Sequence, residues 1–381
     1  MPARLAGLQR NAGRKSLVCR IVVIQNTFGL RPEVTLNVVA IGAGLTGLYL
    51  SWKLSQHHIP FTLLEARARP GGRICSENGF DLGPAWFWGH QQRFIRLLDE
   101  LNLTAFEQAS SGVHLYQSPH GIQTMPGQQM PVSWRVRGGM EAVVDALTAR
   151  LAPDCVHYRQ PADRITLDDT GNTVTVRAGG DTWQASHVVV CLPPRLAAGS
   201  LCFSPALPSE AIAAMRNTPT WMAGHAKALI RYPSPFWREQ GKSGMVISHT
   251  GPLAEIHDAS LDDGTAALFG FFGWSPEMRR AKQSQIESHI CQQLTTLFGN
   301  AAARPLSVTL CDWAQDQYTA TSLDQEPLTY HPVYGLANTR FWQTRLQFAA
   351  TETDRESGGY MEGALAAAEH AFSGLLHGQE R

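Results

Sequence analysis

The first clear hydrophobic pattern lies between residues 36 and 65. Residues 36–41 are apolar except for Asn37, which predicts a buried strand. The next stretch has apolar residues at helical spacing, and residues 61–64 form a second short apolar run. The pattern therefore predicts a strand, a helix and a second strand in direct succession, as in a parallel α/β unit. The apolar positions of the predicted helix are Leu45, Leu48, Tyr49, Trp52 and Leu54.

The same periodicities predict the elements of the remaining chain. Helices are expected over residues 90–101, 139–152, 275–298 and 361–376. Strands are expected near residues 163–167, 172–177, 187–192, 224–232, 244–249, 266–273 and 305–312, with a hairpin at Gly179-Gly180. Because no repeat or low-complexity linker divides these elements, we expect an α/β fold of two domains whose segments interleave.

Three glycines stand between the first strand and the first helix. Gly42, Gly44 and Gly47 have G-x-G-x-x-G spacing, and Glu65 follows the second strand. In this context the first glycine permits a tight turn, the second lets backbone approach a pyrophosphate, and the third lets the helix pack on the sheet. The helix N-terminus offers free N–H groups to phosphate, and an acid at position 65 would accept ribose hydroxyls. The motif thus predicts FAD or NAD rather than NADP, with an ordinary glycine turn as the alternative.

Composition narrows the class of protein. The 381 residues are 44% hydrophobic and 17% charged, as in a globular chain long enough for two domains. The formal net charge is zero, which argues against nucleic acid or an anionic membrane as the main partner. No apolar run reaches the length of a membrane span. The seven cysteines are scattered without a C-x-x-C pair, so we expect reduced thiols in a cytoplasmic protein and no metal site.

Residues 1–33 differ from the rest of the chain. They contain six basic residues and no acidic one before Glu33. A basic, acid-poor N-terminus is also typical of transit peptides. We expect residues 1–33 to be a disordered extension outside the fold.

A second glycine turn follows the nucleotide motif. Residues 70–73 read Pro-Gly-Gly-Arg, and Arg67 precedes them. A glycine pair lets backbone come close to a ligand, and Arg73 is a natural partner for phosphate. The alternative is a surface turn with a solvated arginine. The aromatic residues that follow, at positions 86–88, suit either a flat ring or ordinary core packing.

At this point the sequence resembles the flavin-containing amine oxidase family, which includes monoamine, polyamine and L-amino-acid oxidases. The resemblance begins with LLEARARPGGRI (63–74) and FDLGPAWFWG (80–89). It continues through RGGM (137–140), HVVVCLPP (187–194), FSPALP (203–208), AKA (226–228), PSPFW (233–237), Asp312-Trp313 and FAATETDRESGGYMEGA (348–364). It spans roughly residues 36–376. The family's several helices over the substrate cavity are missing, since only about 45 residues separate Gly89 from Trp134.

The resemblance and the glycine motif together give a set of residues expected to bind FAD. The backbone N–H of Met361, at the start of the last helix, would contact the flavin ring and stabilise negative charge there. Glu352 would lie near the ribityl and pyrophosphate groups. The expected cofactor-binding residues are Gly42, Gly44, Leu45, Thr46, Gly47, Glu65, Ala66, Arg67, Gly71, Gly72, Arg73, Gly83, Pro84, Ala85, Trp86, Ala162, Glu352, Gly359, Tyr360 and Met361.

The expected catalytic residues are Lys227, Trp313 and Tyr360. Lys227 stands in an otherwise apolar strand, where pattern alone fits a solvent-facing edge residue equally well. The resemblance implies that it holds a water against flavin N5, that Trp313 lies near the ring and that Tyr360 is one of two aromatic residues facing it. His225 shares the strand face of Lys227 and is either a substrate contact or a structural histidine.

Two positions depart from the family pattern. Leu323 occupies the place of the second aromatic residue, and Ser322 the place of the cysteine that binds flavin covalently in some members. We therefore expect non-covalent FAD and half of an aromatic cage. Oxidation of amino acids would need an arginine for the carboxylate, and Arg93, Arg135 and Arg340 are the candidates.

The expected protein is an FAD-dependent oxidase of amines that uses O2. Its FAD-binding domain is expected to comprise residues 34–88, 134–216 and 314–381, and its substrate domain residues 89–133 and 217–313. The substrate would be a small amine or an apolar compound, and a second copy or a partner could cover the open site. Two alternatives stay open: oxidation of C–C bonds in a large apolar substrate, and a flavin-binding accessory protein without turnover.

Overall fold

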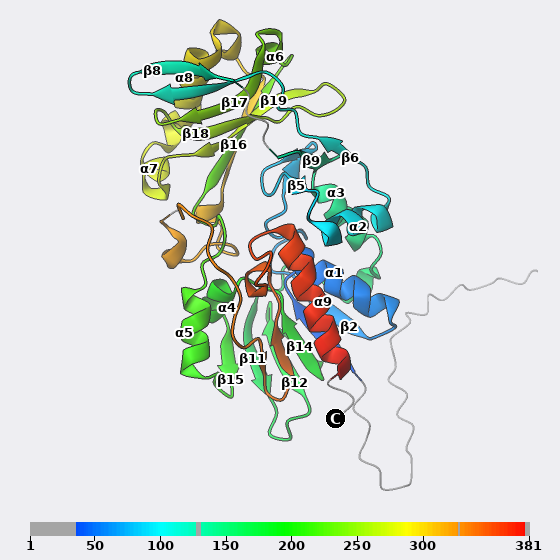
Figure 1. Cartoon of the computed structure of the whole chain (residues 1–381). Helices are drawn as coiled ribbons and strands as arrows, with labels where there is room; N and C mark the ends of the chain where they lie inside the picture. Colours follow the sequence, from blue (N-terminus) through cyan, green and yellow to red (C-terminus); the bar gives the residue numbers. More distant parts are fainter. Residues whose placement is uncertain (1–35, 127–130, 327, 378–381) are drawn as a thin grey trace, which may run out of the picture. The chain divides into compact units, whose positions relative to one another are not determined.

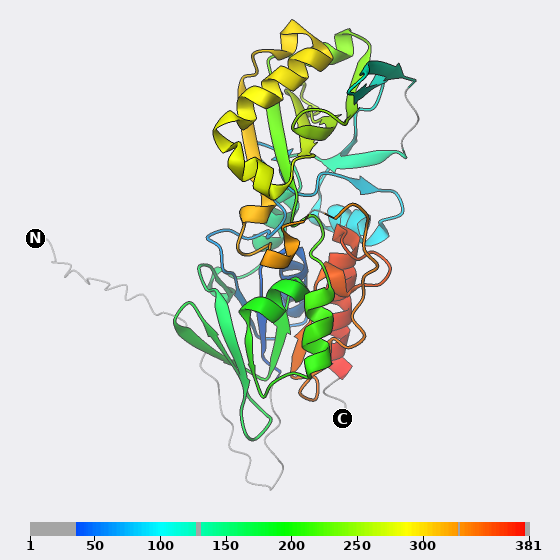
Figure 2. The ribbon, with the colours of Figure 1, turned by 90° about the vertical axis from the view of Figure 1, so that its left-hand side faces the viewer.

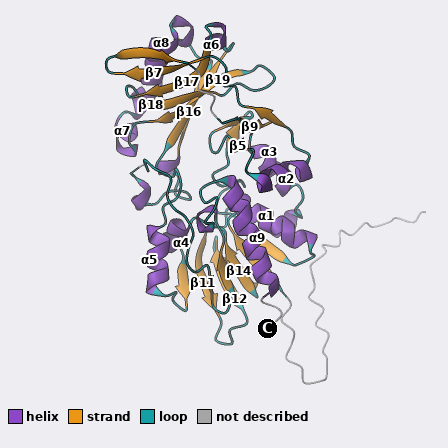
Figure 3. Ribbon diagram, viewed as in Figure 1, coloured by secondary structure: helices purple, strands orange, loops and turns teal. Residues whose placement is uncertain are grey.

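A computed structural model describes residues 36–126, 131–326 and 328–377. The predicted extension over residues 1–33 lies outside the described residues. Figure 1 shows the course of the chain, and Figure 3 the distribution of helices and strands. No helix within the described ranges is long and apolar enough to cross a membrane.

The first pattern of the sequence forms the centre of a six-stranded sheet. Strand β1 (Val38–Ile41) pairs in parallel with β2 (Phe61–Leu64) on one side and β14 (His187–Val190) on the other. All four residues of β1 are buried, as expected for the middle of a parallel sheet. The strand order is β10-β2-β1-β14-β22-β21, where β10 is Val156–His157, β22 is Leu346–Phe348 and β21 is Arg340–Phe341.

Helices cover one face of this sheet (Figure 1). The helix α1 (Leu45–Gln56) follows β1, and α9 (Met361–His377) packs beside it. The short helices α2 (Gln92–Leu101) and α3 (Glu141–Thr148) complete the same core. The expected helix over residues 139–152 is thus shorter than predicted, since Gly139 keeps a left-handed φ of +81° and the chain leaves the helix after Ala149.

A four-stranded sheet packs on the opposite face, in the strand order β13-β12-β11-β15. The predicted hairpin is confirmed, because Gly179 and Gly180 join the two antiparallel strands β12 (Val174–Ala178) and β13 (Asp181–Ala185). The other two strands are β11 (Ala162–Leu167) and β15 (Cys202–Ser204). Helices α4 (Pro194–Ser200) and α5 (Ser209–Asn217) follow.

A seven-stranded sheet holds the remaining core. Its order is β20-β16-β19-β18-β17-β7-β8, with β20 Ser307–Asp312, β16 Ala226–Tyr232, β19 Ala266–Phe272, β18 Leu253–Asp258, β17 Lys242–Ser248, β7 Val113–Ser118 and β8 Gly121–Met125. Alternate residues of β16 face α8, whereas Lys227 and Leu229 face the other way. The short helix α6 (Phe236–Glu239) joins β16 to β17.

The predicted single helix over residues 275–298 is wrong. The chain forms α7 (Pro276–Ala281), a 3-10 turn at Gln283–Gln285 and α8 (Ile286–Phe298), seen along one face of the sheet in Figure 2. Lys282 leaves the helical region, with a φ of −108° and a ψ of 16°. The intervening residues are polar, so no apolar stripe holds them against the sheet.

Residues 89–134 hold strands that the hydrophobic pattern did not reveal. The hairpin β7–β8 extends the seven-stranded sheet, since β7 pairs in parallel with β17. Strands β6 (Ala105–Glu107), β9 (Ser133–Val136) and β5 (Phe87–Trp88) form a separate small sheet. A two-stranded sheet of β3 (Ser76–Glu77) and β4 (Phe80–Asp81) precedes it.

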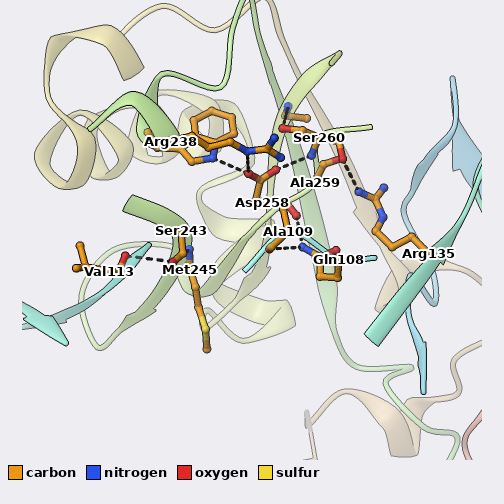
Figure 4. A network of polar contacts seen from close by, with 12 residues as sticks. Gln108, Ala109, Val113, Arg135, Arg238, Ser243, Met245, Asp258, Ala259 and Ser260 are labelled. Carbon is orange, nitrogen blue, oxygen red and sulfur yellow. Dashed lines mark hydrogen bonds and ion pairs between the residues drawn. The ribbon is translucent and has the colours of Figure 1, made fainter. Parts of the chain in front are cut away.

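A polar network around the buried Asp258 ties this segment to the seven-stranded sheet (Figure 4). The carboxylate of Asp258 accepts a hydrogen bond from Arg238 Nε at 2.6 Å. The backbone carbonyl of Asp258 accepts another from the Gln108 side chain at 2.7 Å. Arg135 is buried and donates to the Ala259 carbonyl at 2.7 Å. Burial lowers the pKa of Arg135, and these carbonyl contacts compensate its buried charge.

Candidate active site

The glycine turn leaves the N-terminus of α1 open. Gly44 is the N-cap residue, and no side chain caps the helix there. No acidic residue lies in the first turn, so the free N–H groups and the positive end of the helix dipole remain available to an anion. Gly42 has a φ of +102°, and a Cβ at Gly47 would lie 1.9 Å from the Gly42 carbonyl oxygen. The turn therefore requires glycine at both of these positions.

Glu65 braces this turn from the end of β2. One carboxylate oxygen accepts the N–H of Ala43 and the other the N–H of Arg67, both at 2.8 Å. The residue is almost fully buried. An ionised carboxylate has further acceptor capacity, so these bonds are compatible with the predicted contact to a ribose.

Arg73 and Glu352 pair with each other. Two hydrogen bonds of 2.6 and 3.1 Å join the guanidinium to the carboxylate. Glu352 lies in the 3-10 turn Thr351–Thr353 and has no exposed surface, whereas the Arg73 side chain keeps 28% of its exposure. A bidentate pair of this kind fixes the orientation of the guanidinium beside the glycine turn.

These elements surround one cavity of about 1200 Å³. It extends from the glycine turn to the face of the seven-stranded sheet that carries Lys227. Gly47 and Glu352 are not among its lining residues and lie behind the wall. The predicted site residues that line it are Gly42, Gly44, Leu45, Thr46, Glu65, Ala66, Arg67, Gly71, Gly72, Arg73, Gly83, Pro84, Ala85, Trp86, Ala162, Lys227, Trp313, Gly359, Tyr360 and Met361.

Lys227 is buried in the wall of the cavity. Its Nζ donates to the backbone carbonyls of Asp81 and Gly83, each at 2.9 Å, and lies 4.1 Å from the centroid of the Phe269 ring. Burial lowers the pKa of Lys227 to about 7, although the nearby Asp81 acts in the opposite direction. The amine is therefore poised between its charged and neutral forms near neutral pH.

Trp313 directly follows β20 and is held in place by hydrogen bonds. It begins the 3-10 turn Trp313–Gln315, and its indole Nε1 donates to the Leu82 carbonyl at 3.2 Å. The preceding Asp312 receives two hydrogen bonds from Arg279, at 2.9 and 2.6 Å. This buried pair fixes the end of β20 and with it the position of the indole.

His225 lines the cavity just before β16. Its ring Nδ1 is buried and has no hydrogen-bond partner among the described residues. Burial, together with the charge of Arg279, lowers the pKa of His225. At neutral pH the imidazole is therefore neutral, and it adds an uncharged ring to the cavity wall.

Tyr360 is part of an aromatic group that the sequence did not reveal. The His331 ring stacks on it at 5.0 Å and 9°, and Trp88 meets it edge-on at 6.2 Å. Trp221 packs on His331 at 4.6 Å and also lines the cavity, as does Trp88. Leu323 does not line it and is 60% exposed. Tryptophans from other segments thus supply aromatic surface near Tyr360.

The three candidate arginines for a substrate carboxylate lie elsewhere. Among the residues described as lining the cavity, none is Arg93, Arg135 or Arg340. Arg93 pairs with Glu369 at 2.9 Å, and Arg135 is engaged by backbone carbonyls. The structure thus places none of these three arginines in the described wall of the cavity.

Other residues of the wall come from strands with weak sequence signals. Phe271 and Phe272 end the predicted strand over residues 266–273, and their alternation could have indicated them. Ala254 and Glu255 lie on β18, which the pattern analysis missed because its polar and apolar residues do not alternate cleanly.

The geometry fits a bound dinucleotide with a flat ring. A Cβ at Gly44 would meet no atom within 4 Å, so open space faces the free helix N-terminus where a pyrophosphate would bind. At the other end, Gly359, Tyr360 and Met361 bring the start of α9 to the cavity. Within the described residues no group of His, Cys, Asp or Glu side chains could hold a metal ion.

Comparison with known proteins agrees with this geometry. Residues 41–101 match the NAD(P)-binding Rossmann-like domain. The chain is 23% identical to a probable flavin-containing monoamine oxidase A of Dictyostelium discoideum, with 86% of this chain and 95% of that one aligned. It is 30% identical to the flavin-containing amine oxidase B of Sus scrofa over 63% of this chain, which spans 46% of the pig protein.

Solved structures show the same fold at low sequence identity. Cyclohexylamine oxidase from Brevibacterium oxydans superposes with a TM-score of 0.79 at 22% identity, covering 91% of this chain and all of that one. Putrescine oxidase bound to putrescine gives 0.75 at 20% identity, covering 90% and 99%. Residues 123–371, more than half of the sequence, match the family described as flavin containing amine oxidoreductase. The chain therefore belongs to the family of flavin-containing amine oxidoreductases.

Proposed function

We propose that this protein is an FAD-dependent oxidase of amines. A neutral amine would lose the hydride of its α-carbon to flavin N5, the imine would hydrolyse to an aldehyde and ammonia, and O2 would be reduced to H2O2. The observation that carries the proposal is the convergence of Lys227, Trp313 and Tyr360 on the cavity that the glycine turn opens into. Solved amine oxidases with the same fold support it.

The residues of the wall would act by holding and orienting the reactants. Lys227 can hold a water or proton beside the reacting atoms, because its two carbonyl contacts leave a third position on the nitrogen. The rings of Tyr360 and Trp88 would confine the amine and exclude bulk water. The N-terminus of α9, whose first residue Met361 lines the cavity, would favour negative charge on a ring bound against it.

We further propose that FAD is held without a covalent bond. By the family resemblance Ser322 stands where some members have a cysteine, and a serine forms no thioether. Ser322 is not a lining residue of the cavity.

An anaerobic titration tests the proposed activity. The purified protein should be yellow, and a panel of primary amines should include one that bleaches the flavin band and, in air, yields peroxide. Lys227→Met should slow this turnover at least tenfold, since one activated side chain typically supplies that much. The control Lys282→Met changes a lysine outside the cavity and should leave the rate unchanged.

The same titration separates the two other candidates. Bleaching by a large apolar compound and by no amine would favour oxidation of C–C bonds. A flavin that binds but is bleached by no compound in either panel would favour an accessory protein without turnover.

A further inference from the structure

Three consecutive backbone carbonyls hold the side chains of Lys227 and Trp313. The carbonyl oxygens of Asp81 and Gly83 each accept a hydrogen bond from Lys227 Nζ at 2.9 Å. The carbonyl oxygen between them, that of Leu82, accepts one from Trp313 Nε1 at 3.2 Å. Whatever fixes this short segment therefore also fixes both side chains.

The Asp81 side chain anchors the segment at the end of β4. Its Oδ1 accepts hydrogen bonds from Ser76 Oγ and from the backbone N–H of Met140, both at 2.7 Å. Its Oδ2 is buried and accepts no hydrogen bond from the described residues. Because a buried polar atom without a donor is costly, anchoring accounts for Oδ1 but not for Oδ2.

The buried guanidinium of Arg135 has a matching need for an anion. Its Nη1 donates to two backbone carbonyls, and its Nε has no hydrogen-bond partner among the described residues. Three carboxylates act on its charge, those of Asp81, Asp258 and Asp262, and the last two are each paired with another arginine. Because an arginine stays protonated in proteins and a buried charge needs compensation, Asp81 is the carboxylate left to supply it.

Two cations compete for this one carboxylate. Burial raises the pKa of Asp81, whereas the hydrogen bond from Ser76 and the charges of Arg135 and Lys227 act in the opposite direction. Burial lowers the pKa of Lys227, Asp81 raises it again, and Arg135 lowers it further. The protonation of the amine therefore depends on both charged neighbours, with opposite signs.

The other titratable groups around the amine are neutral or paired. The thiols of Cys75 and Cys311 are neutral at neutral pH, because burial raises the pKa of both. On β18, beyond β19, Glu255 and His257 are hydrogen-bonded to each other at 2.5 Å. The carboxylate and the guanidinium are therefore the charges that matter most to the amine.

We propose that the Asp81 carboxylate is the counter-charge of the Lys227 amine and keeps a share of it protonated at neutral pH. Asp81 is not a lining residue of the cavity, so it is a positioning residue that acts through Lys227. A protonated amine only donates hydrogen bonds, whereas a neutral one also accepts, so this balance decides what the nitrogen offers to the reactants. This role deepens the proposed amine oxidation and rests on it only for its catalytic consequence.

A pH titration of Lys227 by NMR tests this role. The chain has five lysines, so 13C labelling at Cε gives few signals, and Lys227→Met identifies the one of interest. Asp81→Asn removes the charge but keeps an acceptor for Ser76 and Met140. In the purified full chain it should lower the pH of half-protonation of Lys227 by about one unit, as expected for the loss of a nearby opposite charge. Arg135→Gln removes the competing cation and should raise this pH by a similar amount.

Asp354→Asn is the matched control. Asp354 is buried, is in no ion pair among the described residues, and accepts a hydrogen bond from the backbone N–H of Ser357 at 2.7 Å. It is not among the groups that act on the charge of Lys227. The half-protonation pH of Lys227 should therefore stay unchanged in this variant.

The sign of the shift separates charge from packing. A substitution that merely loosened the interior would admit water and move the pKa of Lys227 upward, toward its ordinary value of 10.5. An unchanged or higher half-protonation pH in Asp81→Asn would therefore overturn the proposal. If that variant does not fold, Arg135→Gln decides, since a rise supports the proposal and an unchanged or lower value overturns it.

Failure of the proposed function would look different. If no amine bleaches the flavin while the two charge variants shift Lys227 as stated, amine oxidation fails and the role of Asp81 stands. If amines bleach the flavin but Asp81→Asn leaves the titration of Lys227 unchanged, amine oxidation stands and the role of Asp81 is overturned.

Discussion

The carbonyl oxygen of Gly42 lies where the Cβ of any larger residue at position 47 would have to be, at 1.9 Å. Contact of this kind closes the turn between β1 and α1 and lets the helix pack on the sheet. At Gly44, three residues earlier, the equivalent Cβ would meet no atom within 4 Å. Two glycines of one motif thus have different physical reasons to be glycine.

This difference predicts that an alanine substitution at one glycine affects stability, whereas at the other it affects FAD binding. Gly47→Ala should destabilise the protein without ligand, because backbone must move to relieve the clash. Gly44→Ala should leave the apoprotein's Tm within a few degrees but weaken FAD binding at least tenfold, since the methyl group would occupy the space for the pyrophosphate. Thermal unfolding of the apoproteins and fluorescence titration with FAD check both. Equal loss of apoprotein stability in the two variants would contradict this account.

The Arg73–Glu352 ion pair predicts a large cost for removing one partner. The two residues are 279 positions apart in the sequence, and Glu352 is fully buried. Glu352→Gln should lower the free energy of unfolding by about 3 kcal/mol, the lower end for a broken buried pair because Arg73 is partly exposed. Urea unfolding measures the loss. In the Arg73→Met background the same substitution should cost much less, and equal costs would show that the pair is uncoupled.

The buried Lys227 predicts a pH dependence of stability. Its pKa is about 7 in the folded protein and 10.5 in the unfolded one. Below about pH 7 both states bind the proton, while between pH 7 and 10.5 only the unfolded state does, so stability rises with pH over this window. Relative to Lys227→Met, the wild type should gain at most about 5 kcal/mol across it, taking roughly 1.36 kcal/mol per pKa unit. Denaturant unfolding at pH 7 and pH 10 gives the difference, and a constant gap between the two proteins would refute the lowered pKa.

The serine at position 322 predicts that flavin is released by denaturation. Precipitation of the protein with acid should leave the yellow chromophore in the supernatant. Ser322→Cys should also release it, because residue 322 is not part of the cavity wall. Flavin absorbance in the pellet of the wild type would sink the non-covalent proposal.

Much of the nucleotide end was predictable because its information is local. The strand, glycine turn, helix and second strand follow one another within 30 residues. The spacing of apolar residues indicates the helix and strands, and the backbone requirements at Gly42 and Gly47 indicate the turn. The helix at Met361 was also predicted within a residue, because it is long and apolar. Long, strongly periodic segments carry their own signal.

Predictions were poorest where pairing depends on distant partners. Strands β7 and β8 join the seven-stranded sheet through β17, which lies more than a hundred residues later. The helix over residues 275–298 was predicted as continuous because local pattern does not show where contact with the sheet is lost. The contact of Trp88 with Tyr360 and that of Trp221 with His331 likewise depend on which segments meet in space.

The sequence by itself determined the α/β class, the dinucleotide turn and, through resemblance, the family. Those features rest on short-range spacing and on individual side chains. Only the tertiary structure decided that Arg73 is paired with Glu352, that Lys227 lies between two carbonyls, and that the Asp81 side chain is buried. The physical reason is that charge state, burial and side-chain direction depend on partners brought together by sheet register, which no local pattern encodes.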